Sequence, residues 1–410
     1  MRRATLVVIL AGITFLAGCE KEEPTVSVSG TTFADDLAFL KEHGEVIILS
    51  DSTGKSQVAV IAAMQGRIMT STANGPEGLS FGWINRELIA SGKTQEHINV
   101  FGGEDRFWLG PEGGQFSIFF KKGVEFDLEH WFTPAAIDTE PFELVSSTES
   151  AAVFKKDMQL QNYSETVFNL RIDREIKVLE KEEAVKKLGI TPGDDVRLVA
   201  FESNNKITNT GDNAWTKETG ALSIWILGMF NPSDATTIVI PYKIGPEHLA
   251  GPIVNDAYFG KVPAERLVVK KDVMFFSGDG KYRSKIGLSP MRAKSICGSY
   301  DAVNKVLTIV QYKRPAEAKD YVNSMWEIQD EPYKGDAVNS YNDGPAEPGA
   351  KPLGPFYELE TSSPAAIMDP NFYLEHTHRT FHLQGKEADL EPIAKATLGV
   401  TIAEIKAALK

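Results

Sequence analysis

The segment TVFNLRID, residues 166–173, decides the fold class. Its apolar side chains Phe168, Leu170 and Ile172 alternate with the polar side chains of Asn169 and Arg171. A period of two residues is the pattern of a β-strand with one buried face and one solvated face. The segment therefore predicts a strand in a sheet that has one face buried and the other exposed to solvent.

Many other short runs along the chain are rich in β-branched and aromatic residues. Gly, Asn, Asp and Pro separate them at close intervals, and neither βαβ units nor internal repeats are present. This spacing is typical of an all-β sandwich. The other predicted strands are Val46–Ser50, Val58–Ala62, Val196–Glu202, Leu222–Leu227, Thr237–Ile240, Val273–Ser277, Val306–Tyr312 and Tyr357–Thr361.

Helical patterns are few and short. Glu180–Leu188 ends at Gly189, a residue that commonly terminates helices, and the other helix-like stretches are Ala316–Ser324 and Ile393–Leu409. We therefore expect few helices, one of them a short helix at the C-terminus.

The composition is that of an acidic globular protein. The chain has 410 residues, and 43 Lys and Arg against 56 Asp and Glu give a formal net charge of −13. No long basic stripe is present, so the electrostatic footprint that nucleic acid requires is missing. The sequence predicts no nucleic-acid partner, and a monomer is expected.

The N-terminus has the pattern of a secretory signal. Arg2 and Arg3 precede an uncharged stretch, Ala4–Gly18, that is too short to span a bilayer. Leu16-Ala17-Gly18-Cys19 resembles the lipobox of bacterial lipoproteins, which implies cleavage before Cys19 and its acylation. The alternative is an ordinary secreted protein with a chance cysteine.

The sequence then divides into a lipoprotein signal peptide (1–18), an acylated Cys19 with a tether (19–30), and a single domain (31–410). The expected location is the bacterial cell envelope, lipid-anchored and most consistent with the outer membrane, on its periplasmic or its outer side. The second cysteine, Cys297, lies among small residues and is expected to be a buried structural thiol.

Several enzyme classes are excluded by missing motifs. The chain has no Gly-x-Ser-x-Gly elbow, His-Glu-x-x-His, Walker loop or Cys-x-x-Cys. The glycine-rich stretch 102–114 has no Lys-Ser/Thr, but Trp108 offers a flat face for a sugar, and Arg106 and Glu112 offer hydrogen bonds to hydroxyl groups. The competing interpretation is a tight loop in which Trp108 fills the core and Arg106 pairs with Glu112.

Two carboxylates stand two residues apart on the predicted strand at 357–361. Glu358 and Glu360 should share one face, about 7 Å apart along the strand. Neighbouring carboxylates raise each other's pKa, which would poise one of them as a base near neutral pH. The alternative is a solvated acidic face on an edge strand.

Three of the seven histidines cluster near the C-terminus. His376, His378 and His382 share one face of a predicted strand. They fit a sugar site, a general acid, a polar outer face of the sheet, or ligands to a metal, although no fourth ligand is evident.

A turn region upstream, with Asp336, Asn339, Asn342 and Asp343, fits a sugar-hydroxyl or Ca²⁺ site, or simply turn formation. No cofactor is predicted, and a bound Ca²⁺ or Zn²⁺ stays an open alternative.

Leu359-Glu360-Thr361 is similar to the closing segment of galactose mutarotases, in which Leu-Glu-Thr carries the catalytic base. The mature chain resembles a family of bacterial lipoproteins of the galactose mutarotase-like superfamily, an aldose epimerase-like group. The resemblance implies a large antiparallel supersandwich that binds carbohydrate, with Glu360 as the base. The segments that carry it are Asn99–Gln115, Val254–Gly260, Trp326–Gln329, Asn339–Pro345 and Phe356–His382.

The chain departs from true mutarotases at the general acid. Their mid-chain histidine is missing from the corresponding segment, Lys206–Gly211. Epimerisation needs an acid as well as a base, so His97, His376 or His378 would have to replace it.

Two functions follow. One is an enzyme that binds and processes carbohydrate, as a mutarotase-like epimerase or a glycan-cleaving enzyme. Its catalytic residues would be Glu360, His376 and His378, and its substrate-binding residues Arg106, Trp108, Glu112, Glu358, Asn342 and Asp343. The other is a non-catalytic glycan-binding lipoprotein of a polysaccharide-utilisation system.

Overall fold

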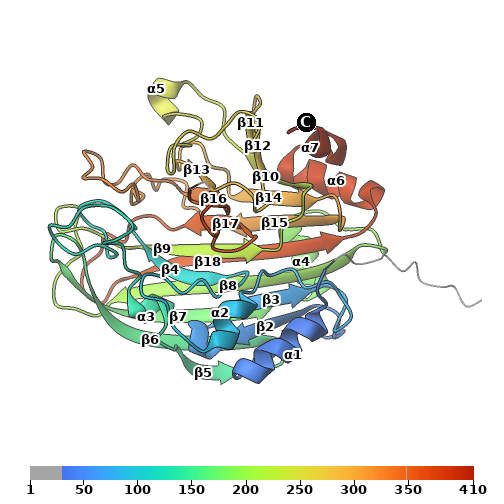
Figure 1. The fold of residues 1–410 in the computed structure, drawn as a ribbon, viewed down its shortest axis with the longest axis horizontal. Coiled ribbons are helices and arrows are strands. Elements are labelled where there is room, and N and C mark those ends of the chain that lie inside the picture. The colour runs from blue at the N-terminus through green and yellow to red at the C-terminus, as the bar shows by residue number, and fades with distance from the viewer. Residues whose placement is uncertain (1–29, 348) are drawn as a thin grey trace, which may run out of the picture.

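A computed structural model describes residues 30–347 and 349–410 (Figure 1). The predicted signal peptide, the acylation site Cys19 and the tether up to residue 29 lie outside the described residues. The predicted all-β class is confirmed, because the described chain forms three antiparallel sheets with few short helices.

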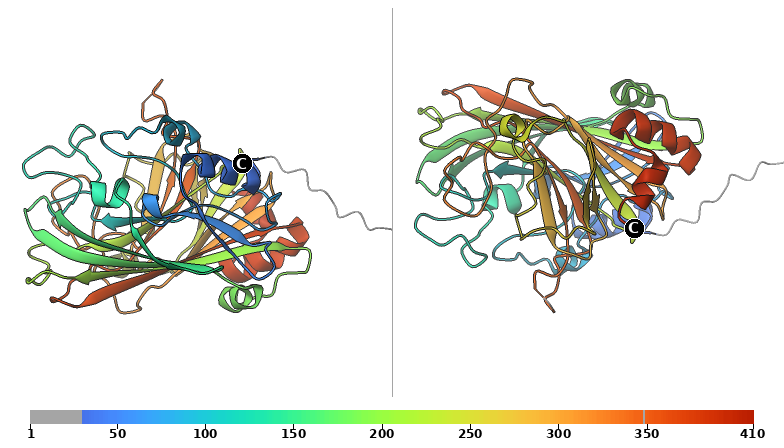
Figure 2. Two further views of the ribbon diagram at one scale, coloured as in Figure 1. Left: turned by 90° about the horizontal axis from the view of Figure 1, so that it is seen from below. Right: turned by 90° about the horizontal axis from the view of Figure 1, so that it is seen from above.

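The first layer is a ten-stranded sheet in which every pair of neighbours is antiparallel. Its long strands form a curved layer along one side of the molecule (Figure 2). In spatial order the strands are β11 (Leu267–Val269), β12 (Val273–Ser277), β10 (Thr236–Pro241), β14 (Ile296–Asp301), β15 (Val306–Tyr312), β18 (Tyr373–Gln384), β8 (Arg197–Asn209), β7 (Val167–Val178), β6 (Ala151–Gln161) and β5 (Glu143–Ser147).

The second layer consists of a five-stranded and a three-stranded sheet. A bridge between Ile68 and Asp105 links the two. The five-stranded sheet has the order β13 (Ser284–Leu288), β16 (Val338–Asn342), β17 (Tyr357–Ser362), β9 (Ser223–Phe230) and β4 (Arg106–Gly110), and the three-stranded sheet is β1 (Ile47–Ser50), β2 (Gln57–Ile61) and β3 (Arg67–Thr72).

The alternation in β7 shows why the layers associate. Phe168, Leu170 and Ile172 are fully buried in the core shared with the second layer, whereas Asn169 and Arg171 are exposed. Removing apolar side chains from water is the dominant favourable term in such packing. The period-two prediction for this strand is therefore confirmed.

Helices α6 (Glu387–Leu398) and α7 (Ile402–Ala407) cover the other face of the ten-stranded sheet (Figure 2). Leu390 and Ile393 pack there in one cluster with Leu307 and Phe381. The remaining helices are α1 (Phe33–His43), α2 (Arg86–Ser91), α3 (Ala135–Asp138), α4 (Lys181–Leu188), α5 (Glu247–Ala250) and the 3₁₀ turn η1 (Ala62–Met64).

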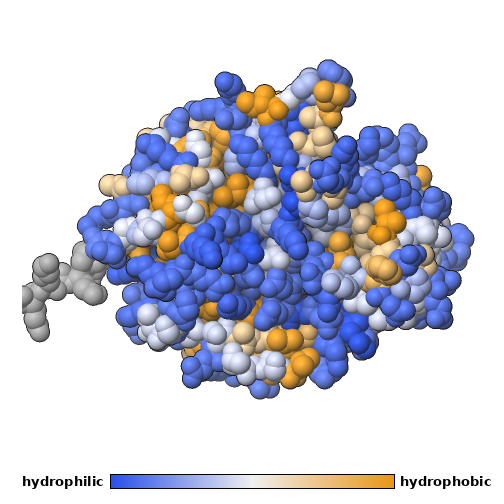
Figure 3. Space-filling model, turned by 180° about the vertical axis from the view of Figure 1, so that it is seen from behind, coloured by the Kyte–Doolittle hydropathy of each residue, from blue (hydrophilic) through white to orange (hydrophobic). Residues whose placement is uncertain are grey.

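Within residues 30–347 and 349–410, no helix has both the length and the apolar character needed to cross a bilayer. The face seen in Figure 3 is mostly hydrophilic, with apolar side chains in small separate groups. Cys297 is a free, fully buried thiol whose pKa is raised by burial to about 12, as expected for a structural cysteine.

Each predicted strand coincides with an observed one, and the helix at Glu180–Leu188 is α4. The helix predicted at Ala316–Ser324 is wrong. The backbone amides of Tyr321 and Asn323 donate to the carbonyls of Tyr333 and Pro332 instead, so pairing with a distant segment overrides a weak helical pattern.

The C-terminal prediction was too simple. Gly399, in the left-handed region at φ 76°, ends α6, and a capping box between Thr401 and Glu404 starts α7. Helix α1 was not predicted, although a capping box between Thr32 and Asp35 marks its start.

A buried arginine joins the two layers. Arg174 on β7 forms an ion pair with Asp105, at 2.6 Å, and both side chains are 0% exposed. The same guanidinium donates to the carbonyls of Gly66 and Asp105 and to the side chain of Asn205. Asp105 directly precedes β4, so this ion pair fixes where β4 enters the second layer.

We predict that Arg174→Met lowers the free energy of unfolding by about 3–5 kcal/mol, because it leaves the Asp105 carboxylate buried without its partner. Chemical denaturation followed by circular dichroism measures this. Arg171→Met, on the exposed face of the same strand, is the control and should leave the unfolding midpoint almost unchanged. Equal effects of the two substitutions would contradict the assigned role of Arg174.

Candidate functional site

The five-stranded sheet presents a polar and aromatic outer face. In register, Arg106 lies opposite Leu227, Trp108 opposite Trp225, and Glu360 opposite Leu227, so these side chains share one face. The alternate residues of β17 point toward the ten-stranded sheet, where the Thr361 hydroxyl reaches β18. The alternation of one short strand thus separates the carboxylates from the interior.

This outer face forms the floor of a pocket of about 500 Å³. The loops before β4, after β4, around Phe259 and between β16 and β17 form its walls. Four of the six tryptophans of the chain line it, namely Trp108, Trp131, Trp225 and Trp326. An aromatic cavity with a few converging polar groups is the usual form of a small-molecule site.

Two glycines allow the chain to enter the floor of the pocket. Gly102 and Gly103 adopt φ of 93° and 109°, and a Cβ atom on Gly102 would lie 2.1 Å from the carbonyl oxygen of Trp83. Only glycine combines this backbone conformation with such a close approach. Glycine at these two positions therefore lets the chain reach Arg106 and Trp108.

Two basic side chains on the floor each lie beside a carboxyl group. Arg106 Nη2 lies 3.2 Å from Glu358 Oε1, and Lys285 Nζ lies 3.1 Å from Glu360 Oε2. Trp225 Nε1 also donates to Glu360 Oε2, at 2.9 Å. Glu360 is 0% exposed and does not line the pocket, whereas Glu358 does. Glu360 therefore holds Lys285 and Trp225 from beneath.

Glu358 is set to hold a proton at neutral pH. Burial raises the pKa of its carboxyl to about 8, in spite of the opposing charge of Arg106, and the nearby charge of Glu360 adds to the rise. Burial also raises the pKa of Glu112 on the pocket wall, against the charge of Lys285. A protonated carboxyl group can donate a hydrogen bond or a proton to a bound molecule.

The sequence-predicted residues divide into two groups. Arg106, Trp108, Glu112 and Glu358 meet in the pocket. Arg106 pairs with Glu358, so its alternative partner Glu112 is wrong. Trp108 is only 2% exposed, so it packs into the core and lines the pocket at the same time.

The structure does not bring His376 and His378 to this pocket. Both lie between the layers and are hydrogen-bonded to Thr361 Oγ1, at 2.8 and 2.9 Å, on the face of β17 that points away from Glu360. Burial lowers the pKa of His376 to about 3 and that of His378 to about 4. Both rings are therefore uncharged at neutral pH, and neither holds the second proton that a general acid would donate.

Of the seven histidines, His97 is the one that lines the pocket. Its Nδ1 lies 2.7 Å from the backbone carbonyl of Trp131, and its ring stacks on Phe132 at 4.5 Å. Because a carbonyl oxygen only accepts, Nδ1 carries the hydrogen and Nε2 of the neutral ring is an acceptor. His97 was named among the possible replacements for the missing general acid.

Asn342 and Asp343 serve the loops and do not line the pocket. Asn342 holds the turn at Gly280, and Asp343 accepts hydrogen bonds from the Tyr341 hydroxyl and from the backbone of Gly354. Among the described residues, no group of three or more His, Cys, Asp or Glu side chains is arranged to hold a metal ion.

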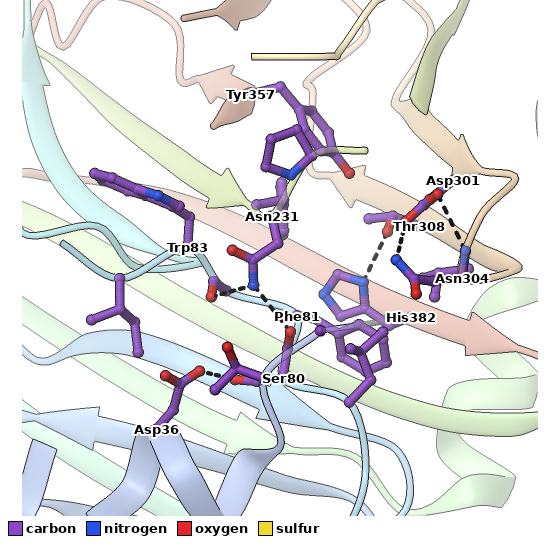
Figure 4. A pocket seen from close by; sticks show the side chains of 18 of the residues that line it. Asp36, Ser80, Phe81, Trp83, Asn231, Asp301, Asn304, Thr308, Tyr357 and His382 are labelled. Atoms are coloured by element: carbon purple, nitrogen blue, oxygen red, sulfur yellow. Dashed lines mark hydrogen bonds between the residues drawn. The ribbon is translucent and has the colours of Figure 1, made fainter. Parts of the chain in front are cut away.

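A second cavity, of about 370 Å³, opens between the layers (Figure 4). His382 lies on its wall, hydrogen-bonded to Thr308 Oγ1 at 2.9 Å and to Glu104 Oε2 at 2.8 Å. Asp36 and Ser80 are bonded to each other across the cavity from Asp301 (Figure 4). These polar groups are hydrogen-bonded to one another, so they leave fewer donors and acceptors for a ligand than the groups of the first pocket.

Sequence reasoning missed several lining residues, notably Arg283, Lys285 and Trp225. The strand that carries Lys285, β13, was not predicted. Trp225 lies in a predicted strand of nearly continuous apolar residues, where no alternation separates a core side chain from a pocket side chain. In Ser284–Leu288, the alternation of Lys285 with Ile286 was the available signal.

The fold and the site define a large antiparallel β-sandwich protein with an aromatic, charge-lined pocket on the outer face of its smaller sheet. The chain belongs to the family of unknown function DUF6786, whose model matches residues 31–409. No curated protein matches the sequence.

Several solved structures are similar to this chain. A protein from Synechocystis sp. PCC 6803 has a TM-score of 0.48 and 11% identity, over 83% of this chain and 96% of its own. A galactose mutarotase related enzyme from Lactobacillus acidophilus has a TM-score of 0.44 and 10% identity, over 82% and 97%. A galactose mutarotase-like protein from Lactobacillus casei has a TM-score of 0.43 and 9% identity, over 83% and 99%.

The raised pKa of Glu358 predicts a pH dependence of stability. The folded state keeps this proton up to about pH 8, whereas the unfolded state loses it near pH 4.5, so the contribution is fully present below about 4.5 and is lost as the pH rises through 8. Glu358→Gln, which mimics the neutral form, should flatten this decline. Thermal unfolding of both proteins between pH 4.5 and 9 tests it, and parallel curves would contradict it.

Proposed function

We propose that the pocket on the five-stranded sheet binds carbohydrate. The observation that carries the proposal is the convergence of four tryptophans with Arg106, Glu112, Lys285 and Glu358 on one cavity. Indole faces pack against the C–H side of a sugar ring, while charged groups form strong hydrogen bonds with its hydroxyls. The sequence resemblance to galactose mutarotase-like proteins supports the same class of ligand.

We further propose that the pocket transfers protons at the anomeric centre of the sugar. Glu358 gives its proton to the ring oxygen while His97 Nε2 takes the proton of the anomeric hydroxyl. The bond from the anomeric carbon to the ring oxygen breaks, and the open-chain aldehyde forms. Closure on the other face reverses both transfers, so no co-reactant is consumed. In this assignment Glu360 is a positioning residue that acts through Lys285 and Trp225.

A non-catalytic binding protein is the second candidate. It is favoured by the enclosure of Glu360 beneath Lys285 and by the positions of His376 and His378 on the far side of β17. In that case the aromatic and charged groups supply affinity alone. The two candidates differ in one observable, which is the exchange rate between the anomers of a bound sugar.

The purified full chain tests the proposal with D-glucose, D-galactose and their hexuronates. Because four of six tryptophans line the pocket, binding should change the intrinsic fluorescence in a saturable way. Two-dimensional exchange NMR then measures interconversion of the anomers. If fluorescence and NMR detect no binding to these sugars or to their oligosaccharides, the carbohydrate proposal fails.

We expect Glu358→Gln to slow anomeric exchange at least about 100-fold, since general acid catalysis contributes about 10²–10⁴-fold, while binding persists. The wild-type rate should fall as the pH rises through about 8, where Glu358 loses its proton. Glu375→Gln, an exposed glutamate on β18, is the matched control and should leave the rate unchanged. Binding without any acceleration by the wild-type protein would identify the non-catalytic function.

We also propose that the protein is lipid-anchored in the bacterial cell envelope, at the outer membrane, on its periplasmic side or at the cell surface. The support is the lipobox-like sequence at residues 16–19. More than one acyl chain gives stable anchoring, whereas one chain binds only marginally. The alternative function places such a protein in a polysaccharide-utilisation system.

Cys19→Ala should move the protein from the detergent phase to the aqueous phase in Triton X-114 partitioning. Cys297→Ala is the control, because that thiol is buried in the domain, and it should leave the partitioning unchanged. Retention of the Cys19→Ala protein in the detergent phase would overturn the anchor assignment.

A further inference from the structure

The cations of the pocket outnumber the carboxylates that hold them. Arg106, Arg283 and Lys285 line the pocket, and only Arg106 and Lys285 have a carboxylate partner within 4.0 Å. Within the described chain, Arg283 makes no ion pair. Its guanidinium lies over the ring of Phe259, 3.9 Å from the centroid. One arginine at the pocket wall therefore lacks an acidic partner.

Arg106 uses only part of its donor capacity. Its Nη2 donates to Glu358, while its Nε and Nη1 have no hydrogen-bond partner among the described residues. The side chain is nine-tenths or more buried, stacked over the indole of Trp108 at 4.2 Å. A guanidinium has five N–H donors in a fork that fits planar, doubly accepting groups. An incoming acceptor would satisfy donors that the protein leaves free.

The acidic groups of the pocket do not offset these cations. Glu360 is enclosed and already paired with Lys285, and Glu129 is exposed at the rim. Burial raises the pKa of Glu358 to about 8 and also raises the pKa of Glu112. Lys351, also at the rim, is paired with Glu87. Among the described residues, Arg283 is therefore the basic group of the inner wall that is left without an acidic partner for a negative group to meet.

We propose that the preferred ligand is a saccharide that carries an anionic group, a carboxylate as in a hexuronate or a sulfate ester, held by Arg283 and Arg106. This inference rests on the proposed carbohydrate function and deepens it. The tryptophan faces hold the sugar ring, and the arginines select the charged substituent. A bidentate pair between a guanidinium and a carboxylate adds geometry as well as strength to the contact.

Matched sugars that differ only at carbon 6 test the inference. D-galacturonate and D-galactose 6-sulfate are titrated against D-galactose, and D-glucuronate against D-glucose, with the purified full chain in a calorimeter. We expect at least one anionic sugar to bind about tenfold more tightly than its neutral partner, because a hydrogen bond to a charged group contributes at least that much to the affinity. Preference for the hexuronate identifies a carboxylate, and preference for the sulfate ester identifies a sulfate.

The outcomes separate this inference from the proposed function. Equal affinity for the neutral and anionic members of each pair overturns the inference and leaves the carbohydrate function intact. Absence of binding by every sugar overturns the carbohydrate function, and the inference with it. Binding of inorganic sulfate as tight as that of galactose 6-sulfate also overturns the inference, because the sugar would then contribute nothing.

Substitutions of Arg283 test whether this residue binds the anionic group of the sugar. Arg283→Gln should reduce the ratio of anionic to neutral affinity about tenfold, and Arg283→Lys should restore part of the ratio because it keeps the charge. Arg171→Gln, an exposed arginine on β7, is the control and should leave the ratio unchanged. An unchanged ratio in Arg283→Gln, in a protein with the wild-type melting temperature, would overturn the assignment.

Discussion

The buried ion pair between Arg174 and Asp105 is the constraint on which the arrangement of the layers depends. Both charges are withdrawn from water, which is costly unless they are paired and further hydrogen-bonded. The requirement is met where β7 faces the start of β4, because Arg174 also donates to Gly66 and Asn205. Because Asp105 points inward, the next residue in the strand, Arg106, points outward. The ion pair that joins the layers therefore also orients Arg106 toward the pocket.

The pocket depends on the alternation of side chains in β17, because one face of this strand packs against the ten-stranded sheet and the other faces the pocket. Tyr357, Leu359 and Thr361 enter the space between the layers, and Glu358 and Glu360 take the opposite face. On that face both carboxyl groups are buried, Glu358 beside Arg106 and Glu360 beside Lys285 and Trp225. Partial desolvation is the physical origin of the raised pKa of Glu358. The raised pKa of this carboxyl group is therefore a result of packing.

The sequence predicts those features of the structure that depend on neighbouring residues, and it does not predict those that depend on contacts between distant segments. Alternation in β7 and the turn residues between short runs predict the strands, because both are local. The meeting of Arg106 with Glu358, 252 residues apart, is tertiary. The histidines of β18 illustrate the limit. Their shared face was predictable, but whether that face met the pocket or the interior depended on which sheet the strand joined.

The division of the pocket between strands and loops has a consequence for how such a protein can diversify. Its floor, with Arg106, Trp108 and Glu358, belongs to strands whose other faces pack in the core, so changes there disturb the fold. Much of its wall, with Trp131, Phe259 and Trp326, belongs to connecting loops, which tolerate substitution and insertion more readily. Substitutions in the wall can therefore reshape the pocket at little cost to stability, whereas substitutions in the floor also disturb the core.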